Sequence, residues 1–377
     1  MSDTMRVRNG KRSGKHKNTL EQGGSRIRFR VWMTINSVIL LGLTAWILLP
    51  DSTGSDLPAV DSPQSQVGAS ALPEASDAPP PTKEQVMAIP GVRFGLSAPQ
   101  VPYSSEELNR LSNAAGARPS ILQFFVKWTE PLRPEAIGLS YDQNALPLIS
   151  WEPWAGSSGG ESQPKYALDT ITAGDHDKYV RAFATTIKDL GYPVALRFAH
   201  EMNGKWYPWS ESRSGNDRGD YVKAWRHLHD VFGEVGATNV IWVWSPNILR
   251  PVPNVSIEKL YPGDKYVDWA GFVGYAVDET TAKAVFQPTI TAIRKFTKKP
   301  LLITETGAQP GSKKLGFIKD FFEWLPEQNG LVGFVWFEFS EKQGGSADWR
   351  YSADTRYAKA FKQGMSKLKL AAPPVHR

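Results

Sequence analysis

The 377-residue chain contains no cysteine, so disulfide bonds are excluded and any exported part must be held together by its hydrophobic core alone. A chain of this length can bury such a core. No glycine-rich loop of the G-x-G-x-x-G or P-loop type follows the first apolar run, which disfavours an open nucleotide-binding sheet. No H-E-x-x-H zinc helix is present either. We therefore assign neither a metal nor a cofactor.

Basic residues are concentrated at the N-terminus, and the rest of the chain holds no excess of them over acidic residues. Residues 1–30 hold nine Lys or Arg against Asp3 and Glu21, a local net charge of +7, and since the whole chain carries +6 the remainder sums to −1. A nucleic-acid-binding protein needs a basic stripe on its folded part. The charge distribution therefore argues against a nucleic-acid partner.

Residues 31–49, VWMTINSVILLGLTAWILL, form a charge-free run about long enough to cross a bilayer core. We interpret this run as a single transmembrane helix that anchors the protein in the cell membrane. The positive-inside rule keeps the basic tail at 1–30 in the cytoplasm and places the rest outside it, in the periplasm or the extracellular space. The alternative is a secreted protein whose signal is cleaved near VGASA at 67–71.

The remaining chain divides into a linker and one large domain. Residues 50–89 are rich in Pro, Ser, Ala and Asp, which predicts a disordered linker. Residues 90–377 alternate apolar runs with amphipathic segments such as 175–191 and 218–236, each ending on a glycine suited to a helix C-cap. Apolar strands separated by helices form parallel sheets, and eight such units predict an α/β fold of the (β/α)8 TIM-barrel type. The runs predicted as strands are 91–97, 120–128, 145–154, 192–201, 239–247, 267–275, 299–307 and 330–339.

In such barrels the functional groups stand at the C-terminal ends of the strands. In the fourth run the two-residue period puts Ala195, Arg197, Ala199 and Glu201 on one side, a small and polar set that suits the lumen. A second carboxylate, Glu305, follows the seventh run. Paired carboxylates are what glycoside cleavage requires, because one must protonate the leaving oxygen while the other supports the oxocarbenium-like centre.

Structural interpretations of the same residues stay open. Glu201 could be the ion-pair partner of Arg197, and His200 is interpreted as a hydrogen-bonded supporting group. The tryptophans near strand ends could be core, since indoles bury much area, or platforms for sugar rings, and we expect at least half to be platforms. The tryptophans in question are Trp151, Trp154, Trp206, Trp209, Trp244, Trp336 and Trp349.

The segments RFAHEMNGKWYPW, VDWAGFVGY, LLITETG and VWFEFSEKQGGSADWR resemble the landmarks of glycoside hydrolase family 26, retaining endo-β-glycanases built on a (β/α)8 barrel. The resemblance covers roughly residues 90–365. It implies that Glu201 is the acid/base and Glu305 the nucleophile. It also implies a set of substrate-binding residues, namely Arg197, His200, Trp206, Tyr275 and Trp336, to which we add Trp151 and Trp154 as sugar platforms.

The family resemblance also bears on the substrate. The stretches HEMNGKWYPW and WEPW look more like glucanase-type members than mannanases, which more often show H-E-N-T-G-x-W-F-W-W. We expect a membrane-tethered, outward-facing enzyme that cleaves a polysaccharide, with β-1,4- or mixed-linkage β-1,3-1,4-glucan favoured and β-mannan the alternative. The cell's own exported polysaccharide would be the nearest substrate. A non-catalytic glycan-binding or assembly protein on the same scaffold is a further alternative, and the presence of both carboxylates argues against it.

Overall fold

The computed structural model describes residues 80–374 and confirms the predicted (β/α)8 barrel. Eight parallel strands pair in chain order, and β8 closes the barrel against β1. The strands are β1 (Arg93–Ser97), β2 (Ile121–Lys127), β3 (Leu146–Glu152), β4 (Val194–Phe198), β5 (Val240–Trp244), β6 (Trp269–Ala276), β7 (Leu301–Ala308) and β8 (Leu331–Phe337). Each observed strand overlaps the run predicted for it.

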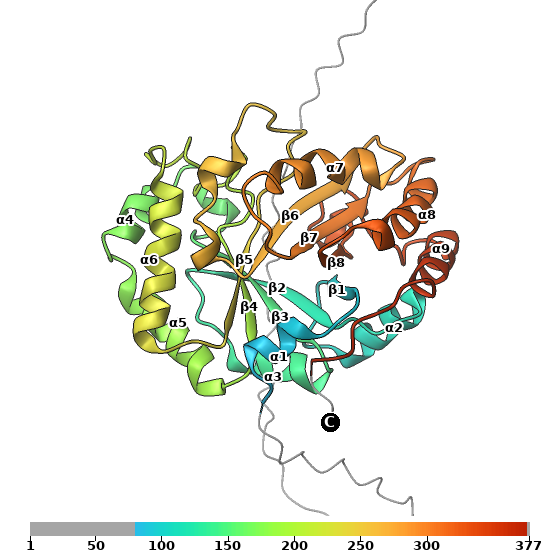
Figure 1. The fold of residues 1–377 in the computed structure, drawn as a ribbon, viewed down its shortest axis with the longest axis horizontal. Helices are drawn as coiled ribbons and strands as arrows, with labels where there is room; N and C mark the ends of the chain where they lie inside the picture. The colour runs from blue at the N-terminus through green and yellow to red at the C-terminus, as the bar shows by residue number, and fades with distance from the viewer. Residues whose placement is uncertain (1–79, 375–377) are drawn as a thin grey trace, which may run out of the picture. The chain divides into compact units, whose positions relative to one another are not determined.

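Helices surround this barrel and also close one end of it. They are α1 (Lys83–Ala88), α2 (Ser105–Ala115), α3 (Pro134–Asp142), α4 (Leu168–Thr172), α5 (Asp177–Leu190), α6 (Asp220–Val235), α7 (Ala282–Ile293), α8 (Lys314–Trp324) and α9 (Thr355–Met365). Figure 1 shows the strands in the centre, with α4, α5 and α6 on one flank and α7, α8 and α9 on the other.

The two-residue period of the strands produces two separate cores. An inner core fills the lumen and includes Ile121, Leu148, Ala195 and Val243. A larger outer core lies between the strands and the helices. In β4, Ala195 belongs to the inner core and its neighbour Leu196 to the outer one, which confirms the predicted lumen-facing side of this strand.

Helix α1 closes the end of the barrel at which the strands begin. Thr82 and Gln85 form a capping box at its N-terminus. Val86 is 1% exposed and belongs to the inner core. At the other end of the helix, Arg93 Nη2 donates hydrogen bonds to the carbonyl oxygens of Val86 at 2.7 Å and Ile89 at 3.0 Å. The folded domain therefore starts before residue 90, the boundary expected from composition.

The predicted cytoplasmic tail at 1–30, the transmembrane helix at 31–49 and the linker as far as residue 79 lie outside the described residues. Within residues 80–374, no helix combines the length and the apolar character needed to cross a bilayer.

Candidate active site

The segment after β4 carries Glu201 to the mouth of the barrel on a strained backbone. Ala199 and Glu201 have φ angles of 43° and 54°, in the left-handed region that non-glycine residues rarely adopt. Both residues are fixed by neighbouring strands. The N–H of Ala199 donates to Trp151 O at 3.0 Å, and the N–H of Glu201 donates to Ser245 O at 2.7 Å. Strain that is held in place by its surroundings in this way is typical of functional sites.

The Glu201 carboxyl group is buried and is held by two uncharged donors. Trp206 Nε1 donates to Oε2 and Asn247 Nδ2 donates to Oε1, each at 2.6 Å. Asn247 is itself fixed by two hydrogen bonds of 2.8 Å with Asn203. Burial, followed by the negative charge of Glu305, raises the pKa of Glu201 to about 7. Glu201 can therefore carry a proton near neutral pH and also release it.

Trp206 reaches Glu201 because the chain turns beneath its ring. A Cβ atom on Gly204 would lie 2.5 Å from Cε2 of Trp206, so this turn accepts only a residue without a side chain. The Trp206 ring is partly exposed. This arrangement explains the glycine in HEMNGKW.

Glu305, on β7, has a charged partner instead. Arg197 Nη2 donates to Glu305 Oε2 at 2.9 Å, and the Tyr275 hydroxyl donates to Oε1 at 2.5 Å. The pairing of β6 with β7 has a bulge at Thr304, immediately before Glu305, and such bulges re-aim side chains. Burial and the charge of Glu305 raise the pKa of Tyr275 well above its ordinary value, so its hydroxyl remains a donor.

The structure thus brings five predicted residues together, namely Glu201, Glu305, Arg197, Trp206 and Tyr275. The negative charge of Glu305 is among the causes that raise the pKa of Glu201, so the two buried carboxyl groups lie close enough to interact. The ion pair considered between Arg197 and Glu201 is not formed, because Arg197 pairs with Glu305. One carboxyl group has a guanidinium partner and the other has only neutral donors. Of the two, burial raises the pKa of Glu201 to about 7.

His200 contacts neither carboxyl group. Its Nε2 lies 2.9 Å from the Tyr207 hydroxyl, and its carbonyl oxygen accepts from Trp209 Nε1 at 2.7 Å. Burial lowers its pKa well below the ordinary value, so the ring is neutral. The Tyr207 and Trp209 rings stack at 4.1 Å, and Trp154 meets both edge-on. The substrate contact expected of His200 is therefore corrected. Its ring supports the loop that carries Trp206.

Two of the predicted sugar-binding tryptophans, Trp151 and Trp336, lie in the outer core and not at the barrel mouth. Trp151 packs on Phe183 of α5 at 4.5 Å, and Trp336 packs on Phe361 of α9 at 5.1 Å. Both belong to the outer core, so the substrate contacts expected of them are wrong. The expectation that half of the tryptophans are platforms is also wrong, because Trp206 keeps a partly exposed ring while the other six are buried. The buried tryptophans are Trp151, Trp154, Trp209, Trp244, Trp336 and Trp349.

The aromatic residue of β8 at the mouth is Phe337, one position after Trp336. Val335 belongs to the inner core, so the alternation of the strand also directs Phe337 inwards. Its ring is partly exposed and lies 6.0 Å from that of Tyr275. The same alternation could have identified it from the sequence. The mouth residues for which no role was predicted are Asn247, Phe337 and Glu152.

Glu201→Gln should make the fold relatively more stable at alkaline pH. The pKa of about 7 in the folded state lies above the ordinary 4.5, so the native protein binds more protons than the unfolded chain between these values. The contribution of Glu201 to stability is therefore present below pH 4.5 and is lost as the pH rises through 7. Glutamine cannot ionise. We expect urea unfolding to show the variant gaining roughly 1–3 kcal/mol relative to wild type between pH 4 and pH 8. A difference that does not change with pH would contradict this.

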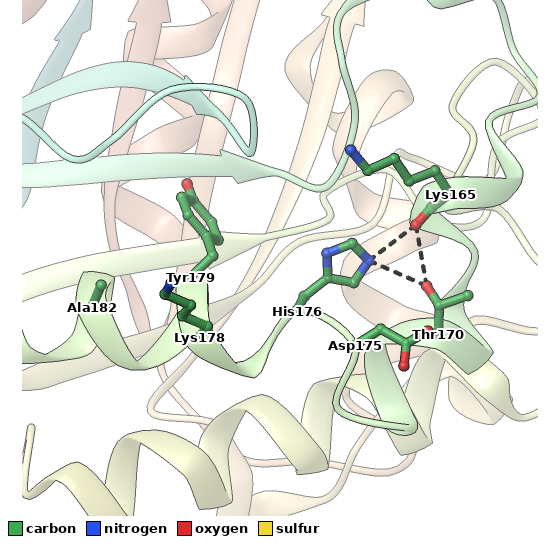
Figure 2. Close-up of a pocket in the computed structure, with 7 residues that line it drawn as sticks. All are labelled: Lys165, Thr170, Asp175, His176, Lys178, Tyr179 and Ala182. Atoms are coloured by element: carbon green, nitrogen blue, oxygen red, sulfur yellow. Dashed lines mark hydrogen bonds between the residues drawn. The ribbon is translucent and has the colours of Figure 1, made fainter.

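A separate surface cavity of about 650 Å³ lies beside α4 and α5 and is lined by residues that include Lys165, His176 and Tyr179 (Figure 2). His176 Nε2 is 2.9 Å from Lys165 O and 3.3 Å from Thr170 Oγ1, so this ring edge is already occupied. Neither Glu201 nor Glu305 lines this cavity, and we locate the candidate site at the barrel mouth. Among residues 80–374, no group of three His, Asp or Glu side chains is arranged to hold a metal ion.

Comparisons with known proteins agree with this geometry. The family model described as "Glycosyl hydrolase family 26" matches residues 148–339, just over half of the chain. Endoglucanase H of Acetivibrio thermocellus is 28% identical over 290 residues, which are 73% of this chain and 30% of that protein. A mannan endo-1,4-beta-mannosidase of Bacillus subtilis is 27% identical over 259 residues, which are 60% of this chain and 68% of that protein. The chain therefore spans less than a third of Endoglucanase H.

A solved structure supports the fold. The catalytic domain of a family 26 endo-beta-1,4-mannanase from a Bacillus species superposes with a TM-score of 0.60 at 16% sequence identity. The match covers 76% of this chain and 90% of that one.

Proposed function

The chain belongs to glycosyl hydrolase family 26, and on that premise we propose that it is a retaining endo-β-glycanase with Glu201 as acid/base and Glu305 as nucleophile. The observation that carries this proposal is the pair of buried, interacting carboxyl groups with different kinds of partner. Arg197 and Tyr275 donate hydrogen bonds to Glu305, whereas burial raises the pKa of Glu201 to about 7.

The reaction takes two steps on these residues. Glu201 first donates its proton to the glycosidic oxygen while Glu305 attacks the anomeric carbon, which releases the leaving sugar and forms a covalent glycosyl ester. The ester no longer carries the negative charge of Glu305, one of the causes that raise the pKa of Glu201. That pKa then falls, and Glu201 takes a proton from the water that cleaves the ester.

Trp206 and Asn247 are the residues that aim Glu201. Their hydrogen bonds occupy one oxygen each and leave the carboxyl group in a single orientation at the mouth. The partly exposed Trp206 ring is also placed to contact a sugar bound at the cleft. Arg197 and Tyr275 do the same for Glu305, so neither carboxyl group has to reorganise during the reaction.

We favour β-1,4- or mixed-linkage β-1,3-1,4-glucan as the substrate. The HEMNGKWYPW stretch and the similarity to Endoglucanase H support this choice. The similarity to mannan endo-1,4-beta-mannosidases supports β-mannan as the second candidate. We further propose that residues 31–49 anchor the enzyme outside the cytoplasm, near exported polysaccharide. Recovery of the full chain in the soluble fraction of cells, or unchanged polymer length after deletion of its gene, would count against that location and role.

The test is digestion of barley-type β-glucan, glucomannan, mannan and β-1,3-xylan with the purified protein. Proton NMR of the first products should show the β-anomer before mutarotation, because two displacements at one carbon retain its configuration. Initial release of the α-anomer would exclude the two-step mechanism. Binding of a glycan without any cleavage would instead support the non-catalytic alternative.

A further inference from the structure

A third buried glutamate stands at the mouth of the barrel and has no part in the two-step reaction. Glu152 is the last residue of β3 and is 4% exposed. Leu146 and Leu148 belong to the inner core, and Ser150 bonds to the lumen-facing Gln123, so the two-residue period also directs Glu152 inwards. Its charge interacts with those of Arg197 and Glu305. Glu152 therefore lies at the barrel mouth, close enough to Glu305 for their charges to interact.

The hydrogen-bonding capacity of Glu152 is only partly used. Within residues 80–374 its single recorded donor is Trp154 Nε1, 3.1 Å from Oε2. Lys127 is its register partner on β2, yet Lys127 Nζ lies 3.6 Å from Glu130 and forms no ion pair with Glu152. Burial raises the pKa of Glu152 to about 7.

Other buried glutamates of the barrel are better satisfied. Glu338, directly after β8, has a pKa raised to a similar value, but its two oxygens accept the backbone N–H groups of Tyr351 and Ser352 at 2.9 Å each. Glu152 Oε1 accepts no hydrogen bond within residues 80–374, and it is not one of the fully enclosed polar atoms there that lack a partner, so it stays accessible to a ligand.

We propose that Glu152 is a substrate-binding residue whose free oxygen bonds the hydroxyl groups of the sugar unit lying beside Glu201, toward β2 and β3. This inference rests on the proposed function. A sugar hydroxyl group can donate to a carboxylate oxygen, and such a charge-assisted hydrogen bond is stronger than one that a neutral amide makes. Trp154 holds Oε2 and thereby turns Oε1 toward the sugar. Glu152 would thus help to choose which hexose is accepted at that position.

The competing explanation is that Glu152 only anchors Trp154 in the β3 loop. Glu152→Gln separates the two explanations, because the amide oxygen can still accept from Trp154 Nε1 while the other atom becomes a donor. Glu338→Gln is the matched control, since it neutralises an equally buried strand-end glutamate that points to backbone N–H groups. Thermal melts and circular dichroism check that each variant is folded.

Binding is measured by calorimetry in the Glu305→Ala background, which prevents turnover, with a mixed-linkage β-glucan hexasaccharide as the probe. We expect the Glu152→Gln double variant to bind at least about 10-fold more weakly than Glu305→Ala, and the Glu338→Gln double variant to bind within about 2-fold of it. In the active background, Glu152→Gln should raise KM by a similar factor and change kcat less.

The outcomes separate the two proposals. If Glu305→Ala binds the hexasaccharide and Glu152→Gln leaves its affinity unchanged, Glu152 is structural and the inference is overturned, while the proposed function stands. If wild type cleaves none of the four polysaccharides and Glu305→Ala binds none of them, the proposed function fails and the inference fails with it.

Discussion

Glu305→Ala is expected to lower kcat on β-glucan by roughly 10⁴-fold or more while leaving the fold intact. The reason is that Glu305 is the carboxyl group held by Arg197 and Tyr275, whereas the oxygens of Glu201 are already engaged by Trp206 and Asn247. The measurement is release of reducing ends, with calorimetry to confirm that glycan binding persists.

Azide gives this experiment a sharper readout. In Glu305→Ala, azide can enter the space left by the missing side chain and attack the anomeric carbon from the face that Glu305 occupied. With an activated aryl β-glycoside as the substrate, the product should be the α-glycosyl azide. Arg197, freed from its partner, remains to hold the anion. Turnover that stays within tenfold of wild type, or a β-configured azide, would remove Glu305 from the nucleophile role.

Glu201→Ala is expected to act differently on substrates with good and poor leaving groups. On β-glucan, whose leaving alkoxide needs a proton, kcat should fall by about 10²- to 10⁴-fold. On a dinitrophenyl glycoside the first step needs no acid, so the glycosyl ester on Glu305 should accumulate and become visible by mass spectrometry. Added azide should restore turnover here and give the β-glycosyl azide, because it attacks from the face that Glu201 occupies.

The pH profile provides the second readout for Glu201. Its pKa of about 7 requires that kcat/KM of wild type on β-glucan decline as the pH rises above 7, when the proton is lost. The alkaline decline should be absent in Glu201→Ala. If both enzymes lose activity over the same range, a different group supplies the proton.

The fold could be predicted almost entirely from the sequence because its signals are periodic. Apolar runs that end on polar or aromatic residues mark all eight strands, and residue size and polarity assign Ala195 and Leu196 of β4 to opposite faces, whereas Ala199, expected in the lumen, lies in the outer core. The N-terminal boundary could not. Helix α1 is a short segment with one fully buried apolar residue, Val86, and such a segment is indistinguishable by composition from the linker before it.

The two carboxylates of the candidate site could be predicted from the sequence, but their hydrogen-bond and ion-pair partners could not. The sequence suggests an ion pair between Arg197 and Glu201, which are close in the chain, and only the closed barrel shows that Arg197 pairs with Glu305. The bulge at Thr304 interrupts the two-residue period that otherwise assigns faces. The family resemblance assigns Trp336 to the substrate-binding residues, although the strand alternation directs Phe337 to the mouth.

Helix α1 also determines where a recombinant form of the folded domain can begin. A recombinant fragment begun at residue 90 would lack Val86 and leave the inner core uncovered at this end, so a fragment of the folded domain should start no later than Pro80. The polypeptide enters at the base, whereas Glu201 and Glu305 open at the opposite rim. A fusion partner joined ahead of residue 80 would therefore attach at the end of the barrel opposite these two carboxyl groups.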